Sequence, residues 1–130
     1  MPVRTLIVDD NASFREEMRA LLTEQGLEIV GCAGSATEAV RQIAELRPDV
    51  ALVDIDLGAD SGLELARRLS ERSDQAAPTR LILISTHDAA EYAELIAQSP
   101  AIGFLAKTDL SAERIREMLM DLDPRGVEWS

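Results

Sequence analysis

Short apolar runs, each about as long as a β-strand, recur along the 130-residue sequence and alternate with stretches of helical spacing. The clearest runs are Leu6-Ile7-Val8, Val50-Ala51-Leu52-Val53 and Leu81-Ile82-Leu83-Ile84. Strands that are apolar on both sides are typical of a parallel sheet with both faces covered. Strand and helix alternate about five times, which favours a doubly wound α/β fold.

Cap signals indicate where the helices begin and end. Capping boxes of the Ser-x-x-Glu type start at Ser13, Ser35 and Ser61, and each precedes a stretch of helical spacing. Gly26 and Pro48 are expected to close the first two helices. Later in the chain, a hydrophobic residue followed by a serine, at positions 110 and 111, predicts the start of a final helix.

These elements predict a flavodoxin-like (βα)5 fold with a five-stranded parallel sheet in the order 2-1-3-4-5. Right-handed crossovers leave few topologies, and this order suits a chain of this length. The second strand, over residues 27–33, contains Glu28, which agrees with an edge position. Residues 1–123 are expected to form one domain, followed by a short tail over residues 124–130.

Composition excludes several classes of function. The formal net charge is -11, with 24 acids against 13 bases, so we expect no direct binding to nucleic acid. A single histidine and a single cysteine exclude a site of several imidazoles and an internal disulfide. No apolar run approaches the length of a membrane span, and the start of the chain resembles no signal peptide. We therefore expect a cytoplasmic protein without a membrane partner.

Acidic residues follow two of the apolar runs. Asp9 and Asp10 end the first, and Asp54 ends the third strand. One such aspartate is commonly only a loop residue or a helix cap. In the predicted sheet, however, the three would share one crevice. Two such charges about 4 Å apart repel by roughly 4 kcal/mol at an effective dielectric near 20. Either some of the acids take up protons, or a cation lies among them, and oxygen ligands favour a hard cation such as Mg²⁺.

A carboxylate beside Mg²⁺ can also attack phosphorus and form an aspartyl phosphate. Lys107 and Ser85 end two further strands and supply an ammonium and a hydroxyl for phosphoryl oxygens. With Asp9-Asp10 and Asp54, this order of residues resembles the receiver domain of two-component response regulators, from about residue 6 to 122. Residues 54–62 and 103–107 most resemble the branch that usually carries a C-terminal helix-turn-helix.

The resemblance implies the roles of the acids. Asp54 would be the phosphoacceptor, charged by a histidine kinase or a phosphotransfer protein. Asp9, Asp10, Asp54 and the backbone carbonyl of Asp56 would hold Mg²⁺, with Asp10 bound directly and Asp9 acting mainly through a metal-bound water. Ser85 would bind the phosphoryl group together with the lysine. The chain would be a signalling switch rather than an enzyme, apart from its own phosphotransfer and dephosphorylation.

The resemblance also implies moving and rate-setting parts. Phe104 stands where the family keeps its switch aromatic, although it could equally be a plain strand residue. Asp56 and His87 would flank the route of the attacking water and tune the lifetime of the phosphoryl group. The output would pass to a downstream protein or to a lost effector domain, and a homodimer would form through the last two βα units.

The sequence departs from the family where Gly58 and Thr108 stand in place of prolines, and where Thr86 is bulkier than the small residue often found after the conserved hydroxyl. A cis bond before a residue other than proline is costly, so we expect a trans bond between Lys107 and Thr108. Two alternatives stay open from the sequence. One is a haloacid-dehalogenase-like phosphatase that uses Asp54 and Asp56, and the other is a pseudo-receiver that binds partners without phosphorylation.

Overall fold

The computed structural model describes residues 3–57, 60–61, 64–65, 67–68, 79–85, 94 and 101–122, with the backbone alone at residues 56, 57, 60, 61, 121 and 122. The elements, in chain order, are β1 (Arg4–Val8), α1 (Ala12–Glu24), β2 (Glu28–Ala33), α2 (Ala36–Leu46), β3 (Val50–Asp54), β4 (Asp56–Leu57), β5 (Asp60–Ser61), β6 (Arg80–Ser85), β7 (Gly103–Ala106), the 3₁₀ turn η2 (Lys107–Asp109) and α5 (Ala112–Leu122).

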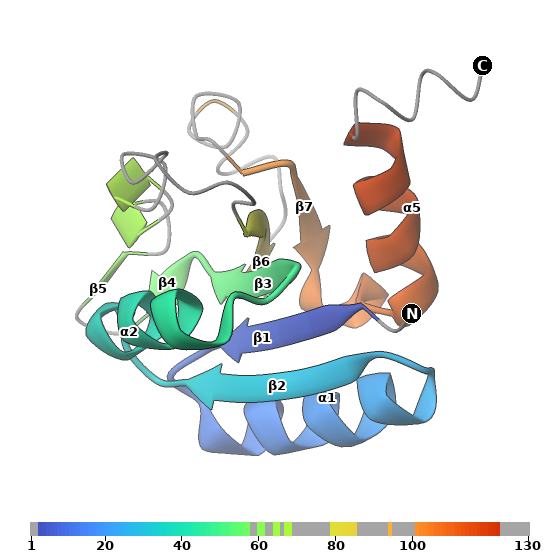
Figure 1. The fold of residues 1–130 in the computed structure, drawn as a ribbon, viewed down its shortest axis with the longest axis horizontal. Helices are drawn as coiled ribbons and strands as arrows, with labels where there is room; N and C mark the ends of the chain where they lie inside the picture. The colour runs from blue at the N-terminus through green and yellow to red at the C-terminus, as the bar shows by residue number, and fades with distance from the viewer. Residues whose placement is uncertain are drawn as a thin grey trace.

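Five parallel strands form the central sheet in the order β2-β1-β3-β6-β7 (Figure 1). Counted among these five strands alone, the order is 2-1-3-4-5, which confirms the predicted fold and the edge position of β2. The two remaining strands, β4 and β5, pair with each other in an antiparallel hairpin directly after β3. The sequence analysis did not predict this hairpin.

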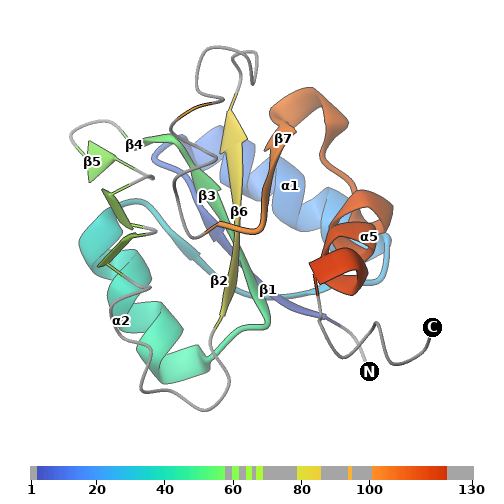
Figure 2. The ribbon, with the colours of Figure 1, turned by 90° about the horizontal axis from the view of Figure 1, so that it is seen from above.

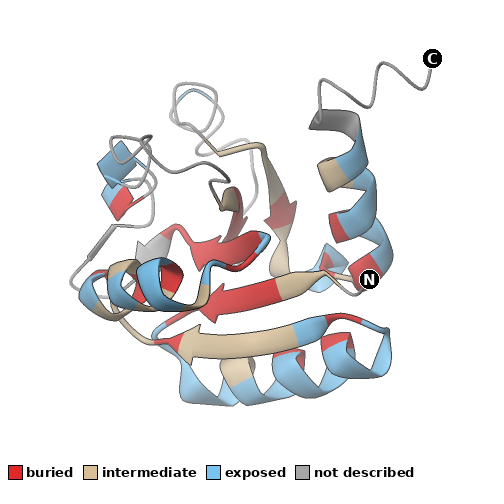
Figure 3. Ribbon diagram, in the orientation of Figure 1, coloured by how far each residue is buried: buried red, intermediate tan, exposed pale blue. Residues whose placement is uncertain are grey.

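Helices cover both faces of the sheet, with α2 on one face and α1 and α5 on the other (Figure 2). Each face has its own apolar cluster because alternate strand residues point to opposite sides. Leu6, Val8 and Val53 belong to the α2 side, whereas Ile7 and Leu52 belong to the other. The central strands β1 and β3 are buried along most of their length (Figure 3). Their ends are therefore firmly placed.

The first helix begins two residues earlier than its capping box predicted. Asn11, not Ser13, is the N-cap, because the Asn11 side chain accepts a hydrogen bond from the backbone N–H of Phe14 at 3.1 Å. Ser13 lies inside α1. Asparagine is as good a cap as serine, and with this cap Phe14 is the third residue of the helix. The predicted cap at Ser13 is therefore wrong.

The other helix ends agree better with the sequence. Ser35 caps α2 by accepting from the Glu38 N–H at 3.2 Å, while the Glu38 carboxylate accepts from the Gly34 N–H. Ser111 accepts from the Arg114 N–H at the start of α5. Gly26 follows α1 with a φ of 102°, the left-handed conformation that glycine tolerates best. The sequence therefore predicted these two N-caps and the end of α1 at Gly26 correctly.

Two further expectations concern the backbone. No cis peptide bond occurs among the described residues, so the bond between Lys107 and Thr108 is trans as expected. Position 58 and residues 86–93, with His87, lie outside the described residues. The helix expected after Ser61 is described only in part, at residues 64–65 and 67–68. None of the described helices combines the length and apolar character needed to cross a membrane.

Candidate functional site

The carboxyl ends of the central strands bring the predicted acids together. Val8 of β1 pairs with Val53 of β3, so the next residues, Asp9 and Asp54, emerge side by side. Asp10 completes the group, and one carboxylate oxygen from each of the three lies within 4.8 Å of the others. The topology thus confirms the convergence of acids that are distant in sequence.

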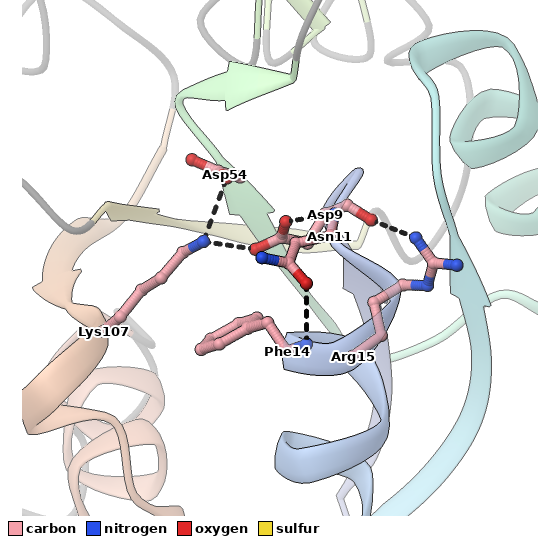
Figure 4. Close-up of polar contacts among 6 residues, drawn as sticks. All are labelled: Asp9, Asn11, Phe14, Arg15, Asp54 and Lys107. Carbon is pink, nitrogen blue, oxygen red and sulfur yellow. Dashed lines mark hydrogen bonds and ion pairs between the residues drawn. The ribbon is translucent and has the colours of Figure 1, made fainter.

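Lys107 directly follows the edge strand β7, and its side chain reaches this group of acids. Its Nζ lies 2.5 Å from Asp9 Oδ2 and 3.1 Å from Asp54 Oδ2 (Figure 4). The side chains are well shielded, since Lys107 is 11% exposed, Asp9 0% and Asp54 8%. One ammonium therefore neutralises part of the charge of two buried carboxylates.

Two opposing effects act on the lysine. Burial of Lys107 lowers its pKa, because water no longer stabilises the charged form, but its close contacts with the negative carboxylates of Asp9 and Asp54 raise it. The carboxylates prevail, and the pKa of Lys107 is raised above its ordinary value. The ammonium is thus charged at neutral pH and is available to bind an anion.

Asp9 is held from several directions. Its Oδ1 accepts a hydrogen bond from the backbone N–H of Asn11 at 2.8 Å, and its carbonyl oxygen accepts one from the Arg15 guanidinium. Its own N–H donates to the Ala33 carbonyl of β2. The second oxygen, Oδ2, is buried without an aligned hydrogen bond among the described residues, so its close partner is the Lys107 ammonium.

The four remaining predicted residues differ in how far the structure describes them. Ser85 is buried at the end of β6, opposite Ala106, the residue before Lys107. Phe104 is half-buried and packs against the apolar cluster on the α2 side. Asp56 follows Asp54 at the start of β4, where only its backbone is described. His87 lies outside the described residues.

Three residues of the site escaped the sequence analysis. Asn11 caps α1 beside the acids, Arg15 holds the carbonyl of Asp9, and the ring of Phe14 lies under the lysine, with Lys107 Nζ 4.2 Å from its centroid (Figure 4). A cap signal for Asn11 was present, because asparagine before an apolar helical pattern is a good N-cap. The contact of Phe14 with Lys107 left no local signal, because the two residues are far apart in sequence.

The chemistry of the acids fits a hard divalent cation. All the candidate ligands are oxygens, which Mg²⁺ prefers, and three carboxylates supply more negative charge than one ammonium balances. Asp9 Oδ2 is, in addition, a buried anionic oxygen whose close contact is already with a cation. The three carboxylates can therefore hold such an ion if the Lys107 ammonium moves away from Asp9.

Comparisons with known proteins agree with this geometry. Residues 5–120 match the family described as the response regulator receiver domain. The structure is similar to the signal receiver domain of a response regulator NarL from Mycobacterium tuberculosis, with a TM-score of 0.75 and 33% identity, covering 92% of this chain and 94% of that one. It is also similar to the response regulator domain of Thermotoga maritima CheB, with a TM-score of 0.77, 28% identity, and coverage of 95% and 100%.

Among curated proteins, a protein-glutamate methylesterase/protein-glutamine glutaminase of Myxococcus xanthus is 36% identical over 119 residues, which is 90% of this chain and 34% of that protein. The chain spans between 30% and 53% of the length of five of its curated relatives. The enzymatic activity in such a name therefore remains a statement about that longer protein.

Proposed function

Because this chain belongs to the response regulator receiver domain family, we propose that it is a signalling switch in which Asp54 accepts a phosphoryl group. The observation that carries the proposal is the meeting of three carboxylates and one ammonium at the carboxyl edge of the sheet. This juxtaposition offers a nucleophile, oxygen ligands for a metal ion and a cation for the incoming phosphate.

The proposed transfer takes place on a side-chain oxygen of Asp54. That oxygen forms a bond to phosphorus while the bond from phosphorus to the imidazole nitrogen of a donor histidine breaks, and the nitrogen keeps the electron pair. Lys107, already in contact with Asp54, binds one of the phosphoryl oxygens. The Ser85 hydroxyl at the end of β6 donates to another. Both groups stabilise charge that develops at the phosphoryl group.

The proposed cofactor is Mg²⁺. Asp9, Asp10, Asp54 and the backbone carbonyl of Asp56 would hold it, with Asp10 as a direct ligand and Asp9 acting mainly through a water. When bound, the ion neutralises negative charge on the carboxylates and on the transferred group. The burial of Asp9 and the exposure of Asp10 support this division, since the exposed carboxylate is the more accessible.

The output is proposed to follow from the movement of Lys107 and of the residues after Ser85. Phosphorylation adds a charge of roughly -1.5 to -2, which draws in the lysine and the hydroxyl. Phe104 would then change its packing and alter the surface of the last two βα units, where a homodimer or a downstream protein would bind. Asp56 and His87 would tune how long the phosphoryl group persists.

The partners follow from the same proposal. A histidine kinase or a phosphotransfer protein would donate the phosphoryl group in the cytoplasm, and an effector domain or a separate protein would receive the signal. Apart from its own phosphorylation and dephosphorylation, the chain would catalyse no reaction. The receiver unit would extend over residues 1–123, in agreement with the family match to residue 120 and the end of α5 at Leu122.

A small phosphodonor tests the proposal. With acetyl phosphate and Mg²⁺, intact-mass measurement should show one phosphoryl adduct, which chelation of the metal should prevent. Asp54→Asn should show none. Asp49→Asn is a matched control, because Asp49 precedes the same strand at its opposite end and should leave the adduct intact.

Other outcomes would identify the alternatives. A wild-type protein without an adduct would contradict the proposal and favour a pseudo-receiver. Continued turnover of a generic phosphomonoester, lost in Asp56→Asn, would favour the phosphatase alternative. Membership of the receiver family supports phosphoryl acceptance over that alternative.

A further inference from the structure

The ring of Phe14 lies against the ammonium of Lys107. Lys107 Nζ is 4.2 Å from the ring centroid, well within the range of a cation–π interaction. Figure 4 shows the ring on one side of the ammonium and Asp54 on the other, with Asp9 beside them. The ammonium is therefore enclosed by two carboxylates and one aromatic face.

The position of the ring is set by the acid loop itself. Asp9 Oδ1 accepts from the Asn11 N–H, and the Asn11 side chain accepts from the Phe14 N–H. Helical side chains lean toward the N-terminus of their helix, so the ring of Phe14 covers the turn that carries the acids. Its other contacts are with the apolar cluster beneath the sheet. These contacts form a closed circuit, because Lys107 contacts both Phe14 and Asp9.

We propose that Phe14 is a positioning residue, which holds the Lys107 ammonium against Asp9 and Asp54 as a resident cation. This proposal rests on the magnesium site of the proposed function. Lys107 must withdraw from Asp9 before the acids hold Mg²⁺, because two positive charges that share one carboxylate repel each other. The aromatic face stabilises the lysine ammonium beside the two carboxylates and so weakens the binding of Mg²⁺ in its place.

The size of the effect follows from the environment of the ammonium. Cation–π contacts correspond to about a two- to fivefold change in an equilibrium at exposed sites and more where water is excluded. With 11% exposure, the Lys107 side chain lies toward the shielded end. We expect replacement of the aromatic face to tighten Mg²⁺ binding by about two- to fivefold or somewhat more.

Phe14 is also a packing residue, so the test must separate the two roles. Phe14→Leu keeps an apolar side chain and removes the aromatic face, whereas Phe14→Tyr keeps the face. Met18→Ala is a matched control for a weakened α1, since Met18 lies one turn along the same helix and packs into the same cluster.

The first experiment uses metal-free, unphosphorylated protein. Lys107 is the only lysine in the sequence, so ¹³C-lysine labelling gives a single set of Cε–Hε signals. The Hε signals should be shifted upfield by the ring in the wild type and in Phe14→Tyr, and this shift should be lost in Phe14→Leu. An unshifted wild-type signal would overturn the proposal, and this result is independent of whether Asp54 accepts phosphate.

The second experiment measures Mg²⁺ affinity by calorimetry. Phe14→Leu should bind Mg²⁺ about two- to fivefold more tightly than the wild type, whereas Phe14→Tyr and Met18→Ala should remain near it. In a Lys107→Met background, Phe14→Leu should change nothing, because the ammonium is already gone. An equal or weaker affinity in Phe14→Leu, or the same gain in the Lys107→Met background, would overturn the proposal.

Discussion

The two sides of the site are built differently. At the β1 end, three hydrogen bonds fix Asp9: the Asn11 N–H donates to its side chain, the Arg15 guanidinium donates to its carbonyl, and its own N–H donates to the Ala33 carbonyl. At the β7 end, Lys107 sends a long side chain across to the acids from a short 3₁₀ turn. The first side cannot move without breaking strand and helix contacts, whereas the second needs only rotation about side-chain bonds.

This difference assigns separate tasks. Under the proposed function, the fixed carboxylates would preserve a site for a metal ion. The Lys107 ammonium neutralises part of the charge of those carboxylates in this structure, and under the proposed function it would later bind a phosphoryl oxygen. Under the proposed function, the lysine and a metal ion would compete for Asp9, so the resting contact should stabilise the protein but oppose metal binding. Replacing the lysine should therefore lower the stability and favour metal binding. Replacing the fixed carboxylate should weaken metal binding.

The largest expected effect comes from removing the movable cation. Lys107→Met should lower the free energy of unfolding by about 2 kcal/mol in metal-free buffer, because Asp9 and Asp54 then face each other without their common partner. Added Mg²⁺ should stabilise this variant more than the wild type. Urea unfolding with and without Mg²⁺ measures both effects. Equal stability of the variant and the wild type without metal would contradict the claim that Lys107 stabilises the metal-free protein.

Neutralising the fixed side should act on the metal. Asp9→Asn should weaken Mg²⁺ binding by about ten- to a hundredfold, as expected for loss of a carboxylate that orients a bound metal or its water. Asp109→Asn is the matched control for net charge, because Asp109 is exposed in the nearby turn η2. Calorimetric titration measures the affinities. The same loss in both variants would mean that long-range charge, not the fixed contact, matters.

The cap of α1 gives a smaller effect. Asn11→Ala should cost about 1 kcal/mol of unfolding free energy, because the Phe14 N–H loses its acceptor. Ser13→Ala should change the stability by less than about 0.5 kcal/mol, since Ser13 lies inside the helix. Thermal melts of the two variants compare them directly. A larger loss of stability in Ser13→Ala than in Asn11→Ala would mean that Ser13 is the N-cap, as the sequence predicted.

The smallest expected effect concerns pH. The carboxylates raise the pKa of Lys107 in the folded protein above its value in the unfolded chain, so their stabilisation is complete below the unfolded pKa. This stabilisation is lost as the pH rises through the folded pKa. The stability difference between wild type and Lys107→Met should therefore shrink above about pH 10.5. A difference that grows at high pH would contradict the ion pairs.

Most of the architecture could be predicted from the sequence. Apolar runs such as Val50–Val53 mark buried strands, and the topology rules for short α/β chains place the first and third strands side by side. The meeting of Asp9 with Asp54 follows from these rules alone. For the same reason, the ends of β6 and β7 predict the neighbourhood of Ser85 and Lys107.

Three features could not be read from local pattern. Asn11 and Ser13 are both good caps, and in the folded chain Asn11 caps α1 while its N–H donates to the Asp9 side chain. The hairpin of β4 and β5 has two-residue strands, which are too short for an alternating pattern. The contact of Phe14 with Lys107 depends on how α1 and η2 meet, which is a property of the folded chain.

The central claim is that Asp54, among the clustered acids, carries the phosphoryl group. Borohydride reduces an aspartyl phosphate to homoserine and leaves a free carboxylate unchanged, so it marks the acceptor. After treatment with acetyl phosphate and Mg²⁺, peptide mapping should find homoserine at position 54 alone. Homoserine at position 9 or 10, or at none of the three, would contradict the account.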